Sequence, residues 1–225
     1  MSLTGATCVV TGASSGVGKA IAAGLAARGA AVLGVARRFE GAAAMPAPGT
    51  VGEAGCDVTD ESAVAGLFAA LDRVDLLVCA AGGGVFGPAA DARAADLRAL
   101  LDAHVTGTFL CVRAALAPMA AGGRVVIIGS TATRFTFPDS ALYAAAKSGQ
   151  DALARAMAAE LRPRGILVTR VHLGAVDTPL WDGRAGFDRA AMLTPAAAAR
   201  TIVDCVAHTD TVVDELLVRP PSGNV

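Results

Sequence analysis

The sequence lacks long apolar runs and has no excess of either charge. Its formal net charge is −1, which argues against a nucleic-acid or anionic-membrane surface as partner. No apolar stretch approaches the roughly 18–20 residues that a membrane-spanning helix needs. The first residues, "MSLTGATCVV", have no positively charged segment and only a short apolar one. We therefore expect no signal peptide and a cytoplasmic protein.

Cysteine spacing argues against a disulfide framework or a thiolate metal site. The five cysteines, at positions 8, 56, 79, 111 and 205, form no C-x-x-C pair, and three of them lie within apolar, strand-like runs. Thiols in such runs usually pack as small hydrophobic groups. We therefore expect reduced, buried cysteines and no bound metal.

What the sequence does contain is a regular alternation of short apolar runs and alanine-rich stretches with helical spacing. Continuous apolar strands that alternate with helices indicate a parallel sheet. The pattern predicts a doubly wound (Rossmann) α/β fold, a mostly parallel seven-stranded sheet with helices on both faces, in a single domain over 1–225. Ligands are then expected outside the carboxyl ends of the strands. The predicted strands are 6–10, 31–36, 50–56, 75–80, 124–129, 167–174 and 216–220, and the predicted helices are 16–28, 60–72, 92–120, 140–162 and 195–208.

One stretch, 179–195, has little pattern of either kind. Its sequence, "PLWDGRAGFDRAAMLTP", combines glycine and proline with two aromatic residues. We interpret it as a substrate-binding loop, with a plain surface loop as the alternative. For Trp181, at its start, a wall of the substrate pocket and a place in the core are equally open.

A glycine-rich turn, "VTGASSGVGKA", follows the first predicted strand and leads into the first predicted helix. Glycines let the backbone turn sharply and approach a ligand, and a helix N-terminus attracts phosphate through its free N–H groups. The spacing G-x-x-x-G-x-G differs from the usual G-x-G-x-x-G fingerprint and from the P-loop. Its position nevertheless favours phosphate binding over an unliganded turn.

Tyr143 is the only tyrosine, and Lys147, four residues later, is one of two lysines in a chain with 17 arginines. On a helix, residues four apart lie on one face. A free tyrosine has a pKa of about 10, and a neighbouring ammonium lowers it. The pair is therefore a candidate general acid/base, with an ordinary surface pair as the alternative.

"TGASSGVG" together with "YAAAK" resembles the short-chain dehydrogenase/reductase family in its single-domain Rossmann form. The resemblance covers nearly the full chain and implies a nicotinamide dinucleotide cofactor and a homodimer or homotetramer. It also implies a Ser–Tyr–Lys catalytic group, usually completed by an asparagine. Ser130, 13 residues before Tyr143, has the family's spacing for the serine that binds the substrate oxygen.

The chain departs from this family at its asparagine positions and at Leu173, which replaces a proline before Gly174. Cys79 and Ala80 stand where the family commonly has two asparagines, and His104 stands where its catalytic asparagine is expected. That asparagine supports a kinked helix and a water linked to the lysine. A histidine could hold the same water, since its ring can donate and accept, or it could merely pack. His172 and His208 are expected to be structural.

The residues after the second strand bear on the choice of cofactor. Ala36 stands where an NAD-preferring enzyme normally has an acid for the ribose hydroxyls, and Arg37 and Arg38 follow directly. A guanidinium binds a 2′-phosphate that a carboxylate would repel. The segment therefore favours NADP(H) over NAD(H), although both arginines could instead be ordinary surface charges.

The combined interpretation is an NADP(H)-dependent oxidoreductase that interconverts a small-molecule carbonyl and an alcohol, with Tyr143 as general acid/base. A non-catalytic dinucleotide-binding sensor and an NAD-preferring alcohol dehydrogenase are the alternatives. Phe86, Phe135, Phe137 and Trp181 suggest an apolar substrate. The predicted catalytic residues are Ser130, Tyr143, Lys147 and His104, and the predicted cofactor-binding residues are Gly12, Ser14, Ser15, Gly16, Val17, Gly18, Arg37, Arg38, Asp57, Val58, Ala80, Ala81, Gly82, Tyr143, Lys147, Gly174 and Thr178.

Overall fold

A computed structural model describes residues 1–184, 186–208 and 211–223. Seven strands form one sheet in the order β3-β2-β1-β4-β5-β6-β7, and every neighbouring pair is parallel. The predicted doubly wound parallel sheet is therefore confirmed, and each observed strand begins and ends within two residues of the predicted one. The strands are β1 (Thr7–Thr11), β2 (Ala31–Ala36), β3 (Val51–Gly55), β4 (Leu76–Cys79), β5 (Arg124–Ser130), β6 (Leu167–Leu173) and β7 (Glu215–Val218).

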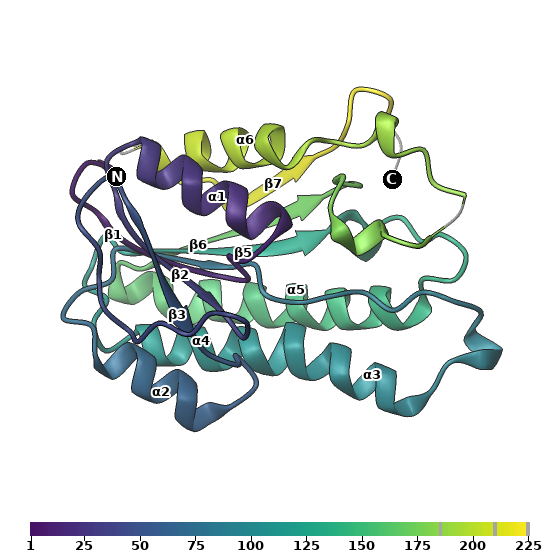
Figure 1. The fold of residues 1–225 in the computed structure, drawn as a ribbon, viewed down its shortest axis with the longest axis horizontal. Coiled ribbons are helices and arrows are strands. Elements are labelled where there is room, and N and C mark those ends of the chain that lie inside the picture. Colours follow the sequence, from purple (N-terminus) through teal and green to yellow (C-terminus); the bar gives the residue numbers. More distant parts are fainter. Residues whose placement is uncertain (185, 209–210, 224–225) are drawn as a thin grey trace.

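Helices cover both faces of the sheet (Figure 1). One face carries α1 and α6, and the other carries α2, α4 and α5, with α3 packed against α5. In the described residues, no helix is both long and apolar enough to cross a bilayer. The helices are α1 (Gly16–Ala27), α2 (Glu61–Ala69), α3 (Ala94–Leu101), α4 (Gly107–Ala115), α5 (Ala141–Leu161) and α6 (Pro195–Ala207).

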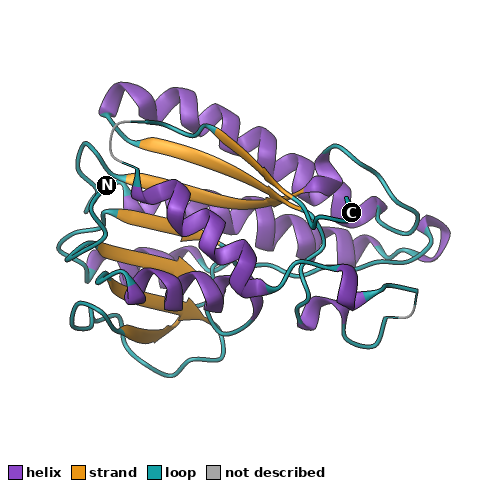
Figure 2. Cartoon of the chain, turned by 90° about the horizontal axis from the view of Figure 1, so that it is seen from above, coloured by secondary structure: helices purple, strands orange, loops and turns teal. Residues whose placement is uncertain are grey.

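The period-2 geometry of the strands produces two separate hydrophobic cores. In β1, Val9 packs with the face of α2, α4 and α5, while Cys8 and Val10 pack with the face of α1 and α6. The sheet lies between two helical layers (Figure 2), and both sets of side chains are buried in its central strands, such as β1 and β4. The near-continuous apolar runs in the sequence have this origin.

The predicted helix over 92–120 is broken in the structure. Between α3 and α4 the chain forms a π-helical turn, η2 (Asp102–Thr106), in which the Gly107 N–H reaches the carbonyl of Asp102. The wider turn ends at Gly107, which lies against Val58 in the connection between β3 and α2: a Cβ at position 107 would lie 2.8 Å from Cγ2 of Val58. The π turn buries the side chain of His104 to 2% exposure.

The strand order reverses between β1 and β4, which is where a doubly wound sheet opens a crevice for ligands. Gly12, directly after β1, has a φ of 70°, and a Cβ on it would lie 2.6 Å from the carbonyl oxygen of Ala80, directly after β4. Thr11 holds the same junction, because its hydroxyl accepts from the N–H groups of Ala80 and Ala81 at 3.1 and 3.2 Å. Only glycine fits at position 12.

We expect Gly12→Ala to lower the free energy of unfolding by about 1–3 kcal/mol, because the new Cβ meets backbone and the φ is left-handed. The matched control is Gly66→Ala, in the exposed part of α2, where an added Cβ meets nothing within 4 Å. That control should instead raise stability by about 0.5–1 kcal/mol. Urea denaturation of both variants measures the difference, and equal midpoints would show that the Gly12–Ala80 contact is no constraint.

Candidate active site

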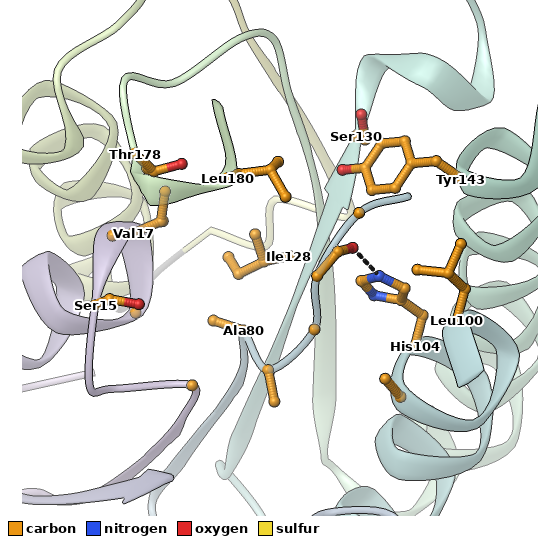
Figure 3. A pocket seen from close by; sticks show the side chains of 18 of the residues that line it. Ser15, Val17, Ala80, Leu100, His104, Ile128, Ser130, Tyr143, Thr178 and Leu180 are labelled. Carbon is orange, nitrogen blue, oxygen red and sulfur yellow. Dashed lines mark hydrogen bonds between the residues drawn. The ribbon is translucent and has the colours of Figure 1, made fainter. Parts of the chain in front are cut away.

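A cavity of about 1140 Å³ opens at the carboxyl ends of the strands, over the β1–β4 crevice. Ligand pockets typically measure roughly 300–1,000 Å³, so this one has room for more than a single small ligand. Every residue that the sequence singled out as catalytic or cofactor-binding lies in its lining. Figure 3 shows Ser15, Val17 and Thr178 on one side of the cavity and Ser130, Tyr143 and His104 on the other.

The glycine turn and the start of α1 form one end of the cavity. Ser15 is the N-cap of α1, its side chain makes no capping bond, and no acidic residue lies in the first turn. The first N–H groups of the helix therefore have no competing partner from these side chains. A Cβ at Gly16 would lie 3.1 Å from Cγ2 of Thr178, and one at Gly18 only 2.5 Å from the carbonyl oxygen of Gly12. This tight, positively polarised cradle fits the pyrophosphate of a dinucleotide.

Two arginines border the neighbouring part of the cavity, at the end of β2. Arg37 and Arg38 are exposed, and Arg38 Nη2 donates to the hydroxyl of Ser15 at 3.2 Å. Asp57 faces the same region, but its Oδ1 accepts from the N–H and the hydroxyl of Thr59 at 3.0 and 2.9 Å. The Thr59 N–H, and to a lesser degree the Arg37 charge, lowers the pKa of Asp57. Asp57 thus holds a turn and also lines the cavity.

Ser130 and Tyr143 lie side by side at the other end, on β5 and α5 (Figure 3). Ser130 ends its strand and accepts from the N–H of Ala132 at 3.1 Å. Both side chains are more than nine-tenths buried. Burial raises the pKa of the Tyr143 phenol, and the Ser130 hydroxyl acts in the opposite direction. The phenol is therefore a protonated group beside a hydroxyl, as a general acid requires.

Lys147 lies one turn further along α5, with Nζ 5.9 Å from the centre of the Tyr143 ring. Its ammonium donates to the carbonyl of Ile128 at 2.8 Å and to Oε1 of Gln150 at 3.0 Å. Burial lowers the pKa of Lys147 to about 7. Gln150 did not stand out in the sequence, because a glutamine on a helix is ordinarily a surface residue.

His104 enters the same end of the cavity from η2. Its Nε2 lies 2.8 Å from the carbonyl oxygen of Gly83, and its ring stands edge-on to Tyr143 with centroids 6.0 Å apart. A carbonyl only accepts, so Nε2 carries the hydrogen and Nδ1 is left as a buried acceptor without a protein partner. Burial, reinforced by the Lys147 charge, lowers the pKa of His104 to about 3. The imidazole is therefore neutral, and Nδ1 could accept from one water.

Aromatic side chains line the cavity next to Tyr143. The ring of Phe86 stacks with Phe137 and Trp181, at 5.9 and 5.7 Å, and lies 5.0 Å from the Tyr143 ring. Trp181 is buried and also donates to a backbone carbonyl, so it serves both the core and the cavity. Phe135, one of the four aromatic residues from which the sequence suggested an apolar substrate, is absent from the lining and is 42% exposed, so it does not support that prediction.

The segment 179–195 is held against the loop that follows β4. Arg184 donates to the carbonyls of Leu180 and Gly84 at 2.8 and 3.0 Å, and its guanidinium lies 4.4 Å from the Phe86 ring centre. One arginine therefore connects two loops that border the aromatic part of the cavity.

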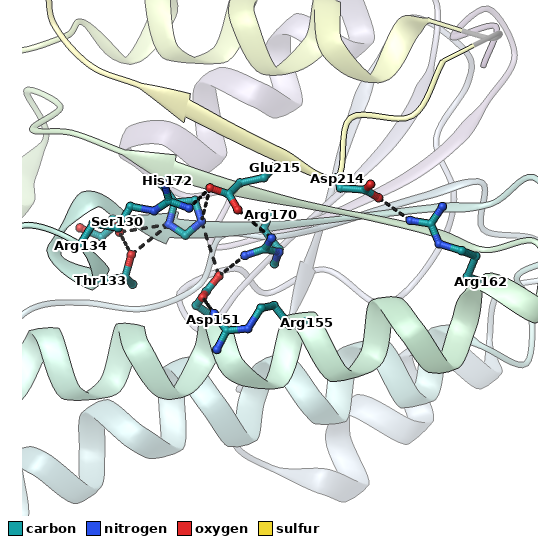
Figure 4. Close-up of polar contacts among 10 residues, drawn as sticks. All are labelled: Ser130, Thr133, Arg134, Asp151, Arg155, Arg162, Arg170, His172, Asp214 and Glu215. Atoms are coloured by element: carbon teal, nitrogen blue, oxygen red, sulfur yellow. Dashed lines mark hydrogen bonds and ion pairs between the residues drawn. The ribbon is translucent and has the colours of Figure 1, made fainter.

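Behind Ser130, a cluster of charged residues fixes α5 to β6 and β7 (Figure 4). Arg170 on β6 pairs with Asp151 of α5 at 2.9 Å and with Glu215 of β7 at 2.8 Å. His172, only 1% exposed, contacts the Thr133 hydroxyl at 3.1 Å and lies 3.5 Å from Asp151. The position of His172 outside the cavity lining agrees with the structural role expected for it.

The sheet topology and the cradle at its crevice define a dinucleotide-binding Rossmann protein. A family model described as short chain dehydrogenase matches residues 6–186, and the chain belongs to the short-chain dehydrogenase/reductase family. This confirms the resemblance read from the two motifs. The protein is accordingly an oxidoreductase of the class that uses NAD(P) on CH–OH or C=O groups of small molecules.

Relatives within the family differ in what they are named for. A D-threitol dehydrogenase of Mycolicibacterium smegmatis is 34% identical over 200 residues, which is 82% of this chain and 76% of that protein. A cyclic-di-GMP-binding biofilm dispersal mediator protein of Escherichia coli is also 34% identical, over 78% of this chain and 75% of that protein. A solved short chain dehydrogenase from Burkholderia cenocepacia, in complex with NADP, has a TM-score of 0.82 at 28% identity and covers 97% of this chain and 98% of its own.

Protonation of His104 should make stability depend on pH. The unfolded chain takes up a proton at this histidine below pH 6.5, whereas the folded protein does so only near pH 3. The stability that His104 contributes is therefore complete above pH 6.5 and is lost progressively as the pH falls toward 3. We expect Tm to fall less steeply between about pH 7 and about pH 5 in His104→Asn than in the parent.

Thermal denaturation across that pH range measures the effect. His208→Asn is the control, since the side chain at position 208 is exposed and the variant should keep the slope of the parent. Equal slopes in all three proteins would contradict the burial of a neutral imidazole at position 104.

Proposed function

We propose that the protein is an NADP(H)-dependent oxidoreductase that interconverts a carbonyl and an alcohol, with Tyr143 as the general acid/base. The observation that carries the proposal is the convergence of Ser130 and Tyr143 at one end of the cavity, opposite the glycine cradle (Figure 3), with Nζ of Lys147, also in the lining, 5.9 Å from the Tyr143 ring centre. When bound, the cofactor supplies or accepts the hydride. The protein's own part is to hold the substrate oxygen, move one proton and exclude water.

Each of the three side chains has a distinct task in this proposal. The Ser130 hydroxyl binds the substrate oxygen beside the Tyr143 phenol. Tyr143 gives its proton to that oxygen in reduction and takes it back in oxidation, and burial keeps the phenol protonated for the first of these tasks. The Lys147 ammonium favours the phenolate that remains after the proton has left. His104 stays neutral and offers Nδ1 to a water at the edge of the group.

The preference for NADP(H) rests on the charges at the end of β2. Arg37 and Arg38 line the cavity, Arg38 contacts Ser15 of the cradle, and Ala36 supplies no carboxylate. A guanidinium beside the cradle attracts a 2′-phosphate through charge-assisted hydrogen bonds. The NADP complex of the Burkholderia cenocepacia relative supports the same choice.

We infer that the substrate carries an apolar group and that 179–195 is the substrate-binding loop. Phe86, Phe137 and Trp181 form the wall next to Tyr143, and Arg184 holds the loop over that wall. An aromatic wall of this kind favours apolar over strongly polar substrates. The homo-oligomeric state remains a prediction from the sequence.

The second candidate function is a non-catalytic dinucleotide-binding sensor. The Escherichia coli relative, which is named for binding cyclic-di-GMP, supports a binding function as the second candidate. A protein that only binds has no need for a buried phenol, a buried ammonium and a hydroxyl together, and this combination favours the enzyme. Turnover distinguishes the two.

We expect Tyr143→Phe to lower turnover about 10²–10⁴-fold, because the phenol hydroxyl is the proposed proton donor. Binding of NADPH should change little, since the ring and its packing remain. Cofactor absorbance with a panel of aldehydes, ketones and alcohols measures turnover, and an NADPH titration measures binding. Unchanged turnover in the variant would exclude Tyr143 as the acid/base, and NADPH binding by a parent that turns over none of the panel would favour the sensor.

Removing Arg38 should weaken NADPH binding specifically. A charge-assisted hydrogen bond contributes about 1.5–3 kcal/mol, so Arg38→Ala should raise the Kd for NADPH roughly 10–100-fold and leave that for NADH unchanged. Arg73→Ala is the matched control, an exposed arginine that precedes β4 and lies outside the cavity lining. Equal losses for NADPH and NADH would show that Arg38 does not read the 2′-phosphate.

A further inference from the structure

Gln150 is the only glutamine in the chain, and it is almost fully buried, at 1% exposure. It lies on α5, three residues after Lys147. A buried amide without hydrogen-bond partners destabilises a protein by roughly 1–3 kcal/mol, so this side chain is expected to have partners for both its oxygen and its NH₂ group. Both of its polar ends are satisfied, and one of them by Lys147.

The orientation of this amide is determined by its neighbours. Lys147 Nζ donates to Oε1 of Gln150 at 3.0 Å, and Nε2 of Gln150 donates to the Thr108 hydroxyl at 2.9 Å. An ammonium can only donate, so the oxygen side must face Lys147 and the NH₂ side must face Thr108. Thr108, from α4, therefore keeps the acceptor end of Gln150 directed at the lysine.

Among the residues that the structure describes, the Lys147 ammonium hydrogen-bonds to no carboxylate. The titratable groups near it are Tyr143 on α5, whose ring centre lies 5.9 Å from Nζ, and His104 on η2, which senses its charge; neither is negatively charged near neutral pH. Asp151, one turn further along α5, is engaged by Arg170 and Arg155. Two neutral oxygens, of Ile128 and Gln150, are thus the acceptors that stabilise the charge.

We propose that Gln150 is a positioning residue of the reaction, which keeps Lys147 cationic and directs its remaining N–H toward the cavity. This inference rests on the proposed function, in which the Lys147 ammonium supports the Tyr143 phenolate. An ammonium has three N–H groups, and the protein binds two of them. Loss of one acceptor removes a charge-assisted hydrogen bond from a group whose burial already lowers its pKa to about 7.

The composition of the chain allows a direct measurement. Lys19 and Lys147 are the only lysines, so NMR of the full chain labelled at the lysine ε-carbon gives two signals, which Lys19→Arg assigns. We expect the pKa of Lys147 to fall by about one pH unit or more in Gln150→Met, and to rise in Gln150→Glu, where a carboxylate replaces the amide. Lys19, which is exposed, is the internal control. A Lys147 titration that is the same in all three proteins would overturn the proposal.

Variants of Thr108 test the orientation separately. Thr108→Val removes the acceptor for the amide NH₂ and should lower the pKa of Lys147 in the same direction, whereas Thr108→Ser should retain the parent value. In the double variant Gln150→Met/Thr108→Val, the pKa should fall no further than in Gln150→Met, because Thr108 acts through Gln150. If the two substitutions lowered the pKa of Lys147 additively, Thr108 would not act through Gln150.

A rate measurement with bound NADPH separates positioning from packing. The reductive rate needs both Tyr143 and Lys147 protonated, so its decline at alkaline pH should begin about one pH unit lower in Gln150→Met. A residue that only packs would lower the rate equally at every pH, and that result would overturn the proposal. Tyr143→Phe in the same assay distinguishes failure of the proposed function from failure of the role assigned to Gln150. If Tyr143→Phe loses turnover while the Gln150→Met profile stays in place, only the role of Gln150 fails.

Discussion

The site depends on the close contact between the backbone after β1 and the backbone after β4. Gly12 approaches Ala80 so closely that no side chain fits between them, and the Thr11 hydroxyl binds the N–H groups on the other side of the gap. Because the strand order reverses at this place, the chain leaves β1 and β4 in opposite directions and opens the crevice. The glycine cradle, the loop with Gly82 and Gly83, and the position of His104 against that loop all follow from this junction.

The opposite end of the cavity is organised by a buried positive charge. Lys147 is almost fully buried, and its ammonium, present below a pKa of about 7, has neutral oxygens as partners rather than a carboxylate. A carboxylate partner would stabilise the ammonium but cancel its field at Tyr143. The distribution of charge in the fold agrees with this requirement, since Asp151 is paired with arginines and His104 remains neutral. The phenol therefore experiences the lysine charge without a compensating anion.

The sequence predicted most of what depends on local pattern, and little of what depends on contacts between distant segments. Strand runs and the glycine turn are local, and the Tyr143–Lys147 spacing is a property of one helix, so each could be recognised. The π turn at 102–106 could not, because the residue that ends it, Gly107, packs against Val58, more than 40 positions away in the sequence. Gln150 was missed for a similar reason, since only the fold brings Thr108 to it. Phe135 was counted among the aromatic residues near the substrate because its residue type alone did not indicate that it would be exposed and outside the cavity lining.

The two ends of the cavity obey different electrostatics. Arg37 and Arg38 are exposed to water, so their attraction for a phosphate is weakened by salt and by the high dielectric constant of the solvent. Lys147 and Tyr143 are buried, and charges there interact strongly and are screened little. Cofactor choice can therefore change through surface substitutions near β2 that leave the proton-transfer group untouched. Substitutions among the buried partners of Lys147 act instead on proton transfer. Each neutral acceptor there stabilises the ammonium, so its loss changes the pKa of Lys147 and the fraction of the lysine that is protonated.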